Sequence, residues 1–151
     1  MKHIALIPAR FDATRFSGKL MAALKSKSVI RHTYDGTVAT GLFDEVYVVT
    51  DSQIIYKEIA NHGGKAIMST KQHESGSDRI AEAAMNLEAD VIVNVQGDTP
   101  FIKKEPLQKL LEQFRDPQVK VGSLMQQLQD QSQIEDPNFV KVCIDKNRNA
   151  L

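Results

Sequence analysis

The sequence predicts an α/β domain in which helices flank a mostly parallel central sheet. Two observations support this fold class: short apolar runs alternate with segments of helical periodicity, and the runs are apolar at consecutive positions. Continuous apolar runs are typical of strands that are buried on both faces, as in a parallel sheet. Their alternation with helices favours right-handed crossovers between parallel strands.

Six apolar runs are candidate strands. Pro8 ends the first run, and Asp51 follows the second. The single cysteine, Cys143, falls in the last run, so we expect it in the core, and a disulfide within the chain is excluded. The runs are Ile4–Ile7, Glu45–Thr50, Ala66–Ser69, Val91–Val95, Val119–Met125 and Phe139–Ile144.

Four segments between these runs show helical spacing of apolar residues. Serines that can cap a helix start two of them, Gly41 closes the first, and Pro106 suits the first turn of the last. We favour the same capping role for Asp51, next to Ser52, over a place in the site. The helical segments are Val29–Thr40, Ser52–His62, Ser77–Leu87 and Lys104–Phe114.

The bulk composition narrows the class of protein. The 151 residues suit one α/β domain over 1–151, and 19 basic residues balance 19 acidic ones. Zero formal net charge argues against a nucleic-acid binder, which normally carries a basic excess. No run approaches the ~20 apolar residues of a membrane-spanning helix, so we expect a cytoplasmic protein without a membrane partner.

Ligands of open α/β sheets bind beyond the carboxyl ends of the strands. The loop Pro8–Lys19, after the first run, contains Arg10, Arg15 and Lys19, with Gly18 beside the last. Guanidinium, ammonium and backbone N–H groups predict an anion site here, and a solvated basic loop is the alternative. The loop fits neither the Walker A pattern nor the dinucleotide fingerprint, which disfavours P-loop ATPases and ordinary NAD dehydrogenases.

Two further loops complete the candidate site. Asp98, beside Gly97 after the run Val91–Val95, could hold Mg²⁺ against phosphate oxygens, or the segment could be a simple turn. The segment His73–Arg79 starts a helix and contains small residues that let a ligand approach the backbone. A plain capped helix start is the alternative for that segment. Cations, backbone donors and one carboxylate together suit phosphoryl-type transfer.

Taken together, the loops resemble a known family. They carry Ile7-Pro8-Ala9-Arg10 with Thr14-Arg15 and Gly18-Lys19, then His73-Glu74-Ser75-Gly76-Ser77-Asp78-Arg79, then Val93-Asn94-Val95-Gln96-Gly97-Asp98 with Pro100, then Phe139-Val140-Lys141-Val142. In order and spacing these motifs resemble the 3-deoxy-manno-octulosonate cytidylyltransferases, the CMP-Kdo synthetases of Gram-negative bacteria. The resemblance extends over essentially the whole chain.

The resemblance implies a nucleotide-diphospho-sugar transferase fold, which is Rossmann-like, and a reaction. CTP and Kdo give CMP-Kdo and pyrophosphate with Mg²⁺, for lipopolysaccharide biosynthesis. The resemblance also implies catalytic roles for Arg10, Lys19 and Asp98, with Asp98 as the metal ligand. The implied substrate-binding residues are Pro8, Ala9, Arg10, Arg15, Lys19, Ser75, Gly76, Arg79, Gln96 and Asp98.

The chain also departs from the family pattern. Thr99 stands where the family has Glu, which removes a carboxylate beside the metal site, and Phe11 stands where Tyr is usual. Family members continue well past residue 151, so the resemblance implies a truncated chain that lacks a second metal-binding Asp and most of the homodimer interface. A cytidylyltransferase for another acidic sugar such as sialic acid, and a non-catalytic nucleotide-binding module, are the alternatives.

Overall fold

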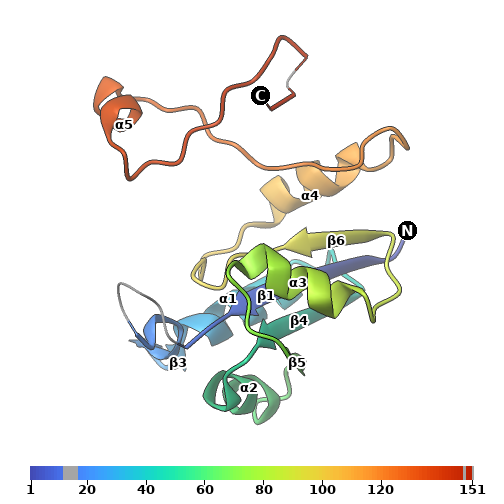
Figure 1. The fold of residues 1–151 in the computed structure, drawn as a ribbon, viewed down its shortest axis with the longest axis vertical. Coiled ribbons are helices and arrows are strands. Elements are labelled where there is room, and N and C mark those ends of the chain that lie inside the picture. Colours follow the sequence, from blue (N-terminus) through green and yellow to red (C-terminus); the bar gives the residue numbers. More distant parts are fainter. Residues whose placement is uncertain (12–16, 148, 151) are drawn as a thin grey trace.

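The computed structural model describes residues 1–11, 17–147 and 149–150. Four parallel strands form the central sheet in the order β5-β4-β1-β6 (Figure 1). The strands are β1 (His3–Ala9), β4 (Glu45–Thr50), β5 (Ala66–Met68) and β6 (Val91–Asn94). The predicted fold class, a parallel sheet flanked by helices, is confirmed.

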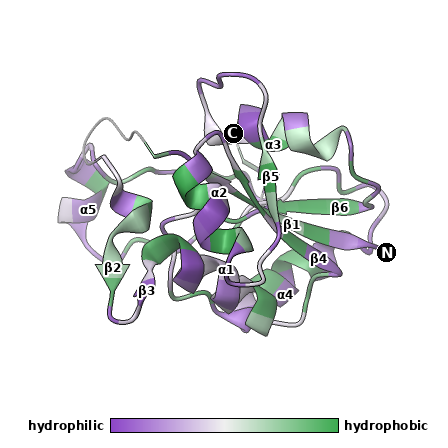
Figure 2. Cartoon of the chain, turned by 90° about the horizontal axis from the view of Figure 1, so that it is seen from below, coloured by the Kyte–Doolittle hydropathy of each residue, from purple (hydrophilic) through white to green (hydrophobic). Residues whose placement is uncertain are grey.

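Consecutive residues of the strands are apolar, and successive side chains of a strand point to opposite sides. The sheet is therefore apolar on both faces. Ala5, Ile7 and Val48 belong to one buried cluster, which helices α1, α2 and α4 contribute to. Ile4 and Leu6 belong to a second cluster with residues of α3. The sheet therefore lies between two helical layers, and Figure 2 shows its strands mostly in the green of hydrophobic residues.

The helices begin and end close to their predicted bounds. Ser28 and Ser52 each accept a hydrogen bond from the backbone at the start of α1 and α2. No helix within the described residues is long and apolar enough to cross a membrane. The helices are α1 (Val29–Ala39), α2 (Gln53–Ala60), α3 (Gly76–Ala84), α4 (Lys104–Gln113) and the short α5 (Gln131–Glu135).

Pro8 does not end the first strand, contrary to the sequence prediction. β1 runs through Pro8 to Ala9, and Pro8 lies opposite Val49 of β4. Val95 donates its N–H to the carbonyl of Leu6, so the backbone groups of Leu6 face β6, and those of Pro8, two residues on, face the same side. Pairing with β6 ends at Leu6, so the missing N–H of Pro8 costs no sheet hydrogen bond.

The chain after α4 contradicts three predictions. Neither 119–125 nor 139–144 forms a strand, and the second range has only an isolated bridge between Ile144 and Ala150. Cys143 is exposed rather than in the core. These residues follow α4 away from the sheet (Figure 1), so their backbone groups find no neighbouring strand to pair with.

Candidate functional site

A cavity of about 680 Å³ lies at the carboxyl edge of the sheet. It is large enough for a small-molecule ligand, since such pockets span about 300–1,000 Å³. Three loops line it: those after β1 and β6, and the start of α3. The lining residues are Pro8, Ala9, Arg10, Lys19, Leu20, His73, Glu74, Ser75, Gly76, Arg79, Gln96, Gly97 and Asp98.

The structure thus brings together the predicted site residues in one pocket, with one left undecided. Arg15 lies outside the described residues. The loop that contains it is closed by a hydrogen bond from Gly18 N–H to the Phe11 carbonyl, 2.8 Å. Gly18 has φ of 73°, a left-handed conformation that favours glycine, and the short helix η1 (Lys19–Met21) follows directly.

Lys19 and Asp98 face each other across the pocket although 79 positions separate them in sequence. The Lys19 ammonium donates to the Asp98 carboxylate at 2.7 Å, and the two side chains are 51% and 46% exposed. A pair this accessible is held by about 0–1 kcal/mol, so a ligand can separate it at small cost. The contact places a predicted phosphate-binding cation next to the predicted metal ligand.

The loop that carries Asp98 is held by one hydrogen bond from α1 and by another within the loop. Thr33, fully buried on α1, donates its hydroxyl to the Gly97 carbonyl at 2.8 Å. Thr99 closes the turn, since its hydroxyl donates to the Gln96 carbonyl at 2.9 Å. The residue that replaces the family's Glu therefore serves the turn itself.

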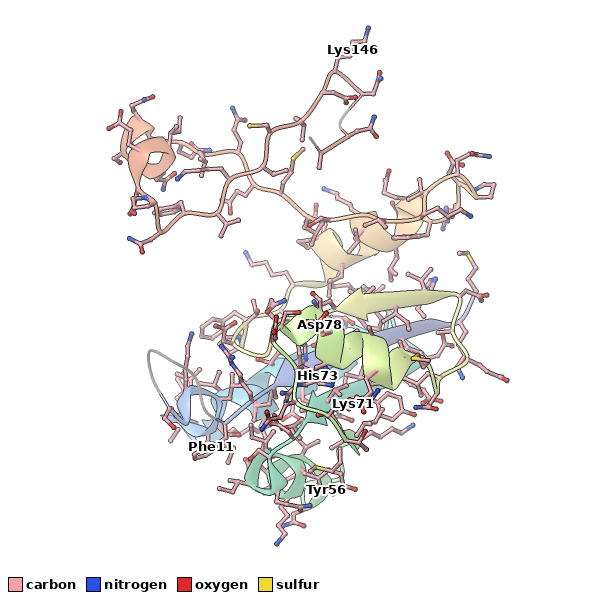
Figure 3. All side chains as sticks on the ribbon, in the orientation of Figure 1. Phe11, Tyr56, Lys71, His73, Asp78 and Lys146 are labelled. Atoms are coloured by element: carbon pink, nitrogen blue, oxygen red, sulfur yellow. The ribbon has the colours of Figure 1, made fainter. Side chains whose placement is uncertain are left out.

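The start of α3 forms another side of the pocket. Ser75 is its N-cap, with Asp78 completing a capping box, so the helix begins one residue earlier than predicted and Ser77 is not the cap. A Cβ on Gly76 would meet Pro8 Cγ at 3.2 Å, so glycine lets α3 approach β1 closely. In Figure 3, Asp78 and His73 lie near this end of α3.

Arg79 joins the ends of two strands. It is 4% exposed, and it donates to the Ala9 carbonyl at 2.8 Å and to the Asp51 carboxylate at 2.6 Å. The Arg79 hydrogen bond lowers the pKa of Asp51. The preference for Asp51 as a helix cap was wrong: Ser52 caps α2, and Asp51, which is not among the lining residues, pairs with Arg79, which is.

His73 belongs to the predicted segment His73–Arg79 and lines the pocket, but the sequence analysis gave it no role of its own. Its Nε2 lies 2.6 Å from the Glu82 carboxylate, which also accepts hydrogen bonds from the backbone and hydroxyl of Thr70. The Thr70 and His73 hydrogen bonds lower the pKa of Glu82 to about 2. Glu82 thereby ties the loop 70–75 to α3. The sequence gave no sign that His73 would contact Glu82, because this contact depends on how the loop 70–75 folds back onto α3.

The pocket fits a metal that arrives with an anionic ligand. Among the described residues no group of three His, Cys, Asp or Glu could hold a metal ion. Mg²⁺, however, is often bound through one or two carboxylates plus substrate phosphates. Asp98 is half exposed in the pocket beside Lys19, and Glu74 is a second carboxylate in the lining. This donor set is compatible with such a shared site.

The fold is that of the nucleotidyltransferases. A solved structure described as CMP:2-keto-3-deoxy-manno-octonic acid synthetase complexed with CTP superposes with a TM-score of 0.87 and 31% identity. The match covers 100% of this chain and 63% of that one. The sequence profile described as "Cytidylyltransferase" matches residues 4–151. The chain belongs to the cytidylyltransferase family.

Curated relatives confirm the resemblance seen in the motifs. The 3-deoxy-manno-octulosonate cytidylyltransferase of Flavobacterium johnsoniae is 53% identical over 100% of this chain. That of Christiangramia forsetii is also 53% identical, over 98% of the chain. The chain spans 63% and 61% of the length of these two relatives.

Proposed function

We propose that this chain is the CTP-binding part of a 3-deoxy-manno-octulosonate cytidylyltransferase. The reaction transfers CMP from CTP to the anomeric hydroxyl of Kdo and gives CMP-Kdo and pyrophosphate, in the cytoplasm, for lipopolysaccharide biosynthesis. The observation that carries the proposal is that one pocket gathers the loops after β1 and β6 and the start of α3. These segments carry the sequence motifs that resemble the 3-deoxy-manno-octulosonate cytidylyltransferases.

The charges of the pocket suit the chemistry of this transfer. The anomeric hydroxyl of Kdo releases its proton to solvent as its oxygen bonds to the α-phosphorus, and the bond from that phosphorus to the bridging oxygen of the leaving pyrophosphate breaks. Arg10 and Lys19 line the pocket, and their positive charges offset the charge that develops on the leaving group. Mg²⁺, held by Asp98 together with the phosphates, would add positive charge at the same place.

Binding first requires the Lys19–Asp98 pair to open. Both side chains are about half exposed, so the pair is weak, and a triphosphate offers the ammonium a stronger partner than one carboxylate. Gln96 and Asp98 both line the pocket, and in this proposal Gln96 contacts the acidic sugar. Further Kdo contacts, and a homodimer, belong to the longer protein in this proposal.

Pyrophosphate release with CTP, Kdo and Mg²⁺, run on this chain and on a full-length family member, tests the function. We expect turnover with Kdo and none with sialic acid in the full-length protein, and CTP binding by this chain. Turnover with sialic acid but not with Kdo would show that sialic acid, rather than Kdo, is the substrate. CTP binding by this chain without turnover would leave the transfer itself to the longer protein, and absence of CTP binding would refute the proposal.

The role of Asp98 is tested separately with Asp98→Asn. We expect a large loss of rate with CTP binding largely retained, because the amide keeps the shape of the side chain but loses the charge that holds a divalent cation. A Mg²⁺ dependence equal to that of the wild type would refute the metal role.

A further inference from the structure

Arg79 is a buried cation in the lining of the pocket with both of its partners supplied by the protein. Its side chain is 5% exposed, and its two terminal nitrogens each make one hydrogen bond. A buried charge is costly unless it is paired and hydrogen-bonded, and Asp51 together with the Ala9 carbonyl meets that requirement. The guanidinium thus serves the protein's own architecture, whereas the resemblance assigns it to the substrate.

The two partners lie at the carboxyl ends of neighbouring strands. Ala9 is the last residue of β1, and Asp51 follows Thr50, which is the last residue of β4 and pairs with Ala9. Arg79 itself comes from the first turn of α3. One planar side chain therefore ties three elements together where they meet the pocket.

The Ala9 carbonyl belongs to the same peptide unit as the N–H of Arg10. A peptide unit is planar, so a hydrogen bond that fixes the carbonyl also fixes the direction in which the chain leaves β1. Arg10 is the first cation of the pocket, and its side chain is exposed. An exposed arginine side chain has many rotamers. The direction of its backbone therefore determines how many of these rotamers reach a ligand in the pocket.

We infer that Asp51 and Arg79 form a positioning pair: Asp51 orients the Arg79 guanidinium, which holds the Ala9–Arg10 peptide so that Arg10 faces the phosphates of the nucleotide. Neither residue needs to touch the substrate. The part of this inference that concerns phosphates rests on the proposed function, and the part that concerns the Ala9–Arg10 peptide does not.

The first test needs no ligand. Asp51→Asn keeps the shape of the side chain and removes its charge, and Arg79→Lys keeps the charge but replaces the two-pronged donor by a single ammonium. We expect amide hydrogen exchange in residues 6–11 to become about tenfold faster in both variants. Far-UV circular dichroism verifies that both variants fold.

Matched controls carry the same changes elsewhere. Asp90→Asn alters a half-exposed carboxylate that precedes β6, at the opposite edge of the sheet, and Arg115→Lys alters an exposed arginine after α4. Neither change is expected to alter exchange in residues 6–11. Unchanged exchange in Asp51→Asn and Arg79→Lys would overturn the inference.

The second test asks whether the pair acts through Arg10. We expect Asp51→Asn to weaken CTP binding about tenfold, and to have less than about a twofold effect when Arg10→Ala is already present, because coupled residues are non-additive. A purely structural role predicts equal losses in both backgrounds, and that result would also overturn the inference. If the wild type binds no CTP, the proposed function fails while the exchange measurement still decides whether the pair positions the peptide.

Discussion

Gly97 offers a sharp test of how the loop after β6 fits against β1. A Cβ at this position would lie 2.9 Å from the Pro8 carbonyl oxygen, 3.3 Å from Ile30 Cδ1 and 3.4 Å from Leu20 Cδ1. The first contact is with the backbone of β1, which is paired with β4 at Pro8 and with β6 as far as Leu6, so the strand cannot easily move away. Gly97→Ala must therefore displace the loop that carries Asp98.

Overpacking of this kind costs about 1–3 kcal/mol of unfolding free energy. Gly36 is the matched control, because it lies inside α1 and its Cβ would meet Ile102 at 3.6 Å and the Pro100 carbonyl at 3.9 Å, ordinary contact distances. Alanine is the better helix former, so Gly36→Ala should stabilise the protein by about 0.5–1 kcal/mol. The same chemical change is thus expected to have opposite signs at the two sites.

Urea unfolding followed by far-UV circular dichroism measures both effects, and it suits a chain with no tryptophan. We expect the midpoint to fall for Gly97→Ala and to rise for Gly36→Ala, each with an unchanged m value. A Gly97→Ala protein as stable as the wild type would show that the loop does not pack against Pro8 as described. A loss of stability at both glycines would refute the distinction between a backbone clash at Gly97 and ordinary contact distances at Gly36.

Three further predictions concern stability. Lys19→Ala should change the unfolding free energy by less than about 0.5 kcal/mol, because its partner Asp98 is half exposed, and a larger loss in urea would contradict this. Glu82→Gln should remove a pH dependence of the unfolding free energy. The lowered pKa of Glu82 stabilises the fold at pH values above the ordinary pKa of 4.5, and this stabilisation is lost as the pH falls towards about 2. Acid unfolding curves measure this, and identical acid limbs for variant and wild type would disprove the role of Glu82. Ile55 is fully buried, so Ile55→Ala should lower the unfolding free energy by about 2–5 kcal/mol in the same urea assay. Its neighbour Ile54 is 54% exposed, so Ile54→Ala should lower it by about 0.5 kcal/mol or less. Equal losses at the two isoleucines would contradict the assigned faces of α2.

The sequence predicted the central sheet, and the predicted site residues that the structure describes all line one pocket, for a common reason. Parallel strands have their carboxyl ends at one edge, so Lys19 after β1 and Asp98 after β6 could be expected in one pocket despite their separation in sequence. Pro8 misled the prediction because its effect depends on which side of β1 still has a partner. The apolar runs at 119–125 and 139–144 misled it because an apolar run becomes a strand only where another strand is available.

By itself, the sequence determined the features that depend on neighbouring residues. These are the faces of the helices, the buried runs of the sheet, and the cation-rich and glycine-containing loops that follow the strands. Tertiary structure alone decided which charged groups meet: Arg79 with Asp51 and the Ala9 carbonyl, and Glu82 with His73. Such pairs form only at hydrogen-bond distance, and the distances between segments are set by the packing of α3 against the sheet, which local periodicity does not encode.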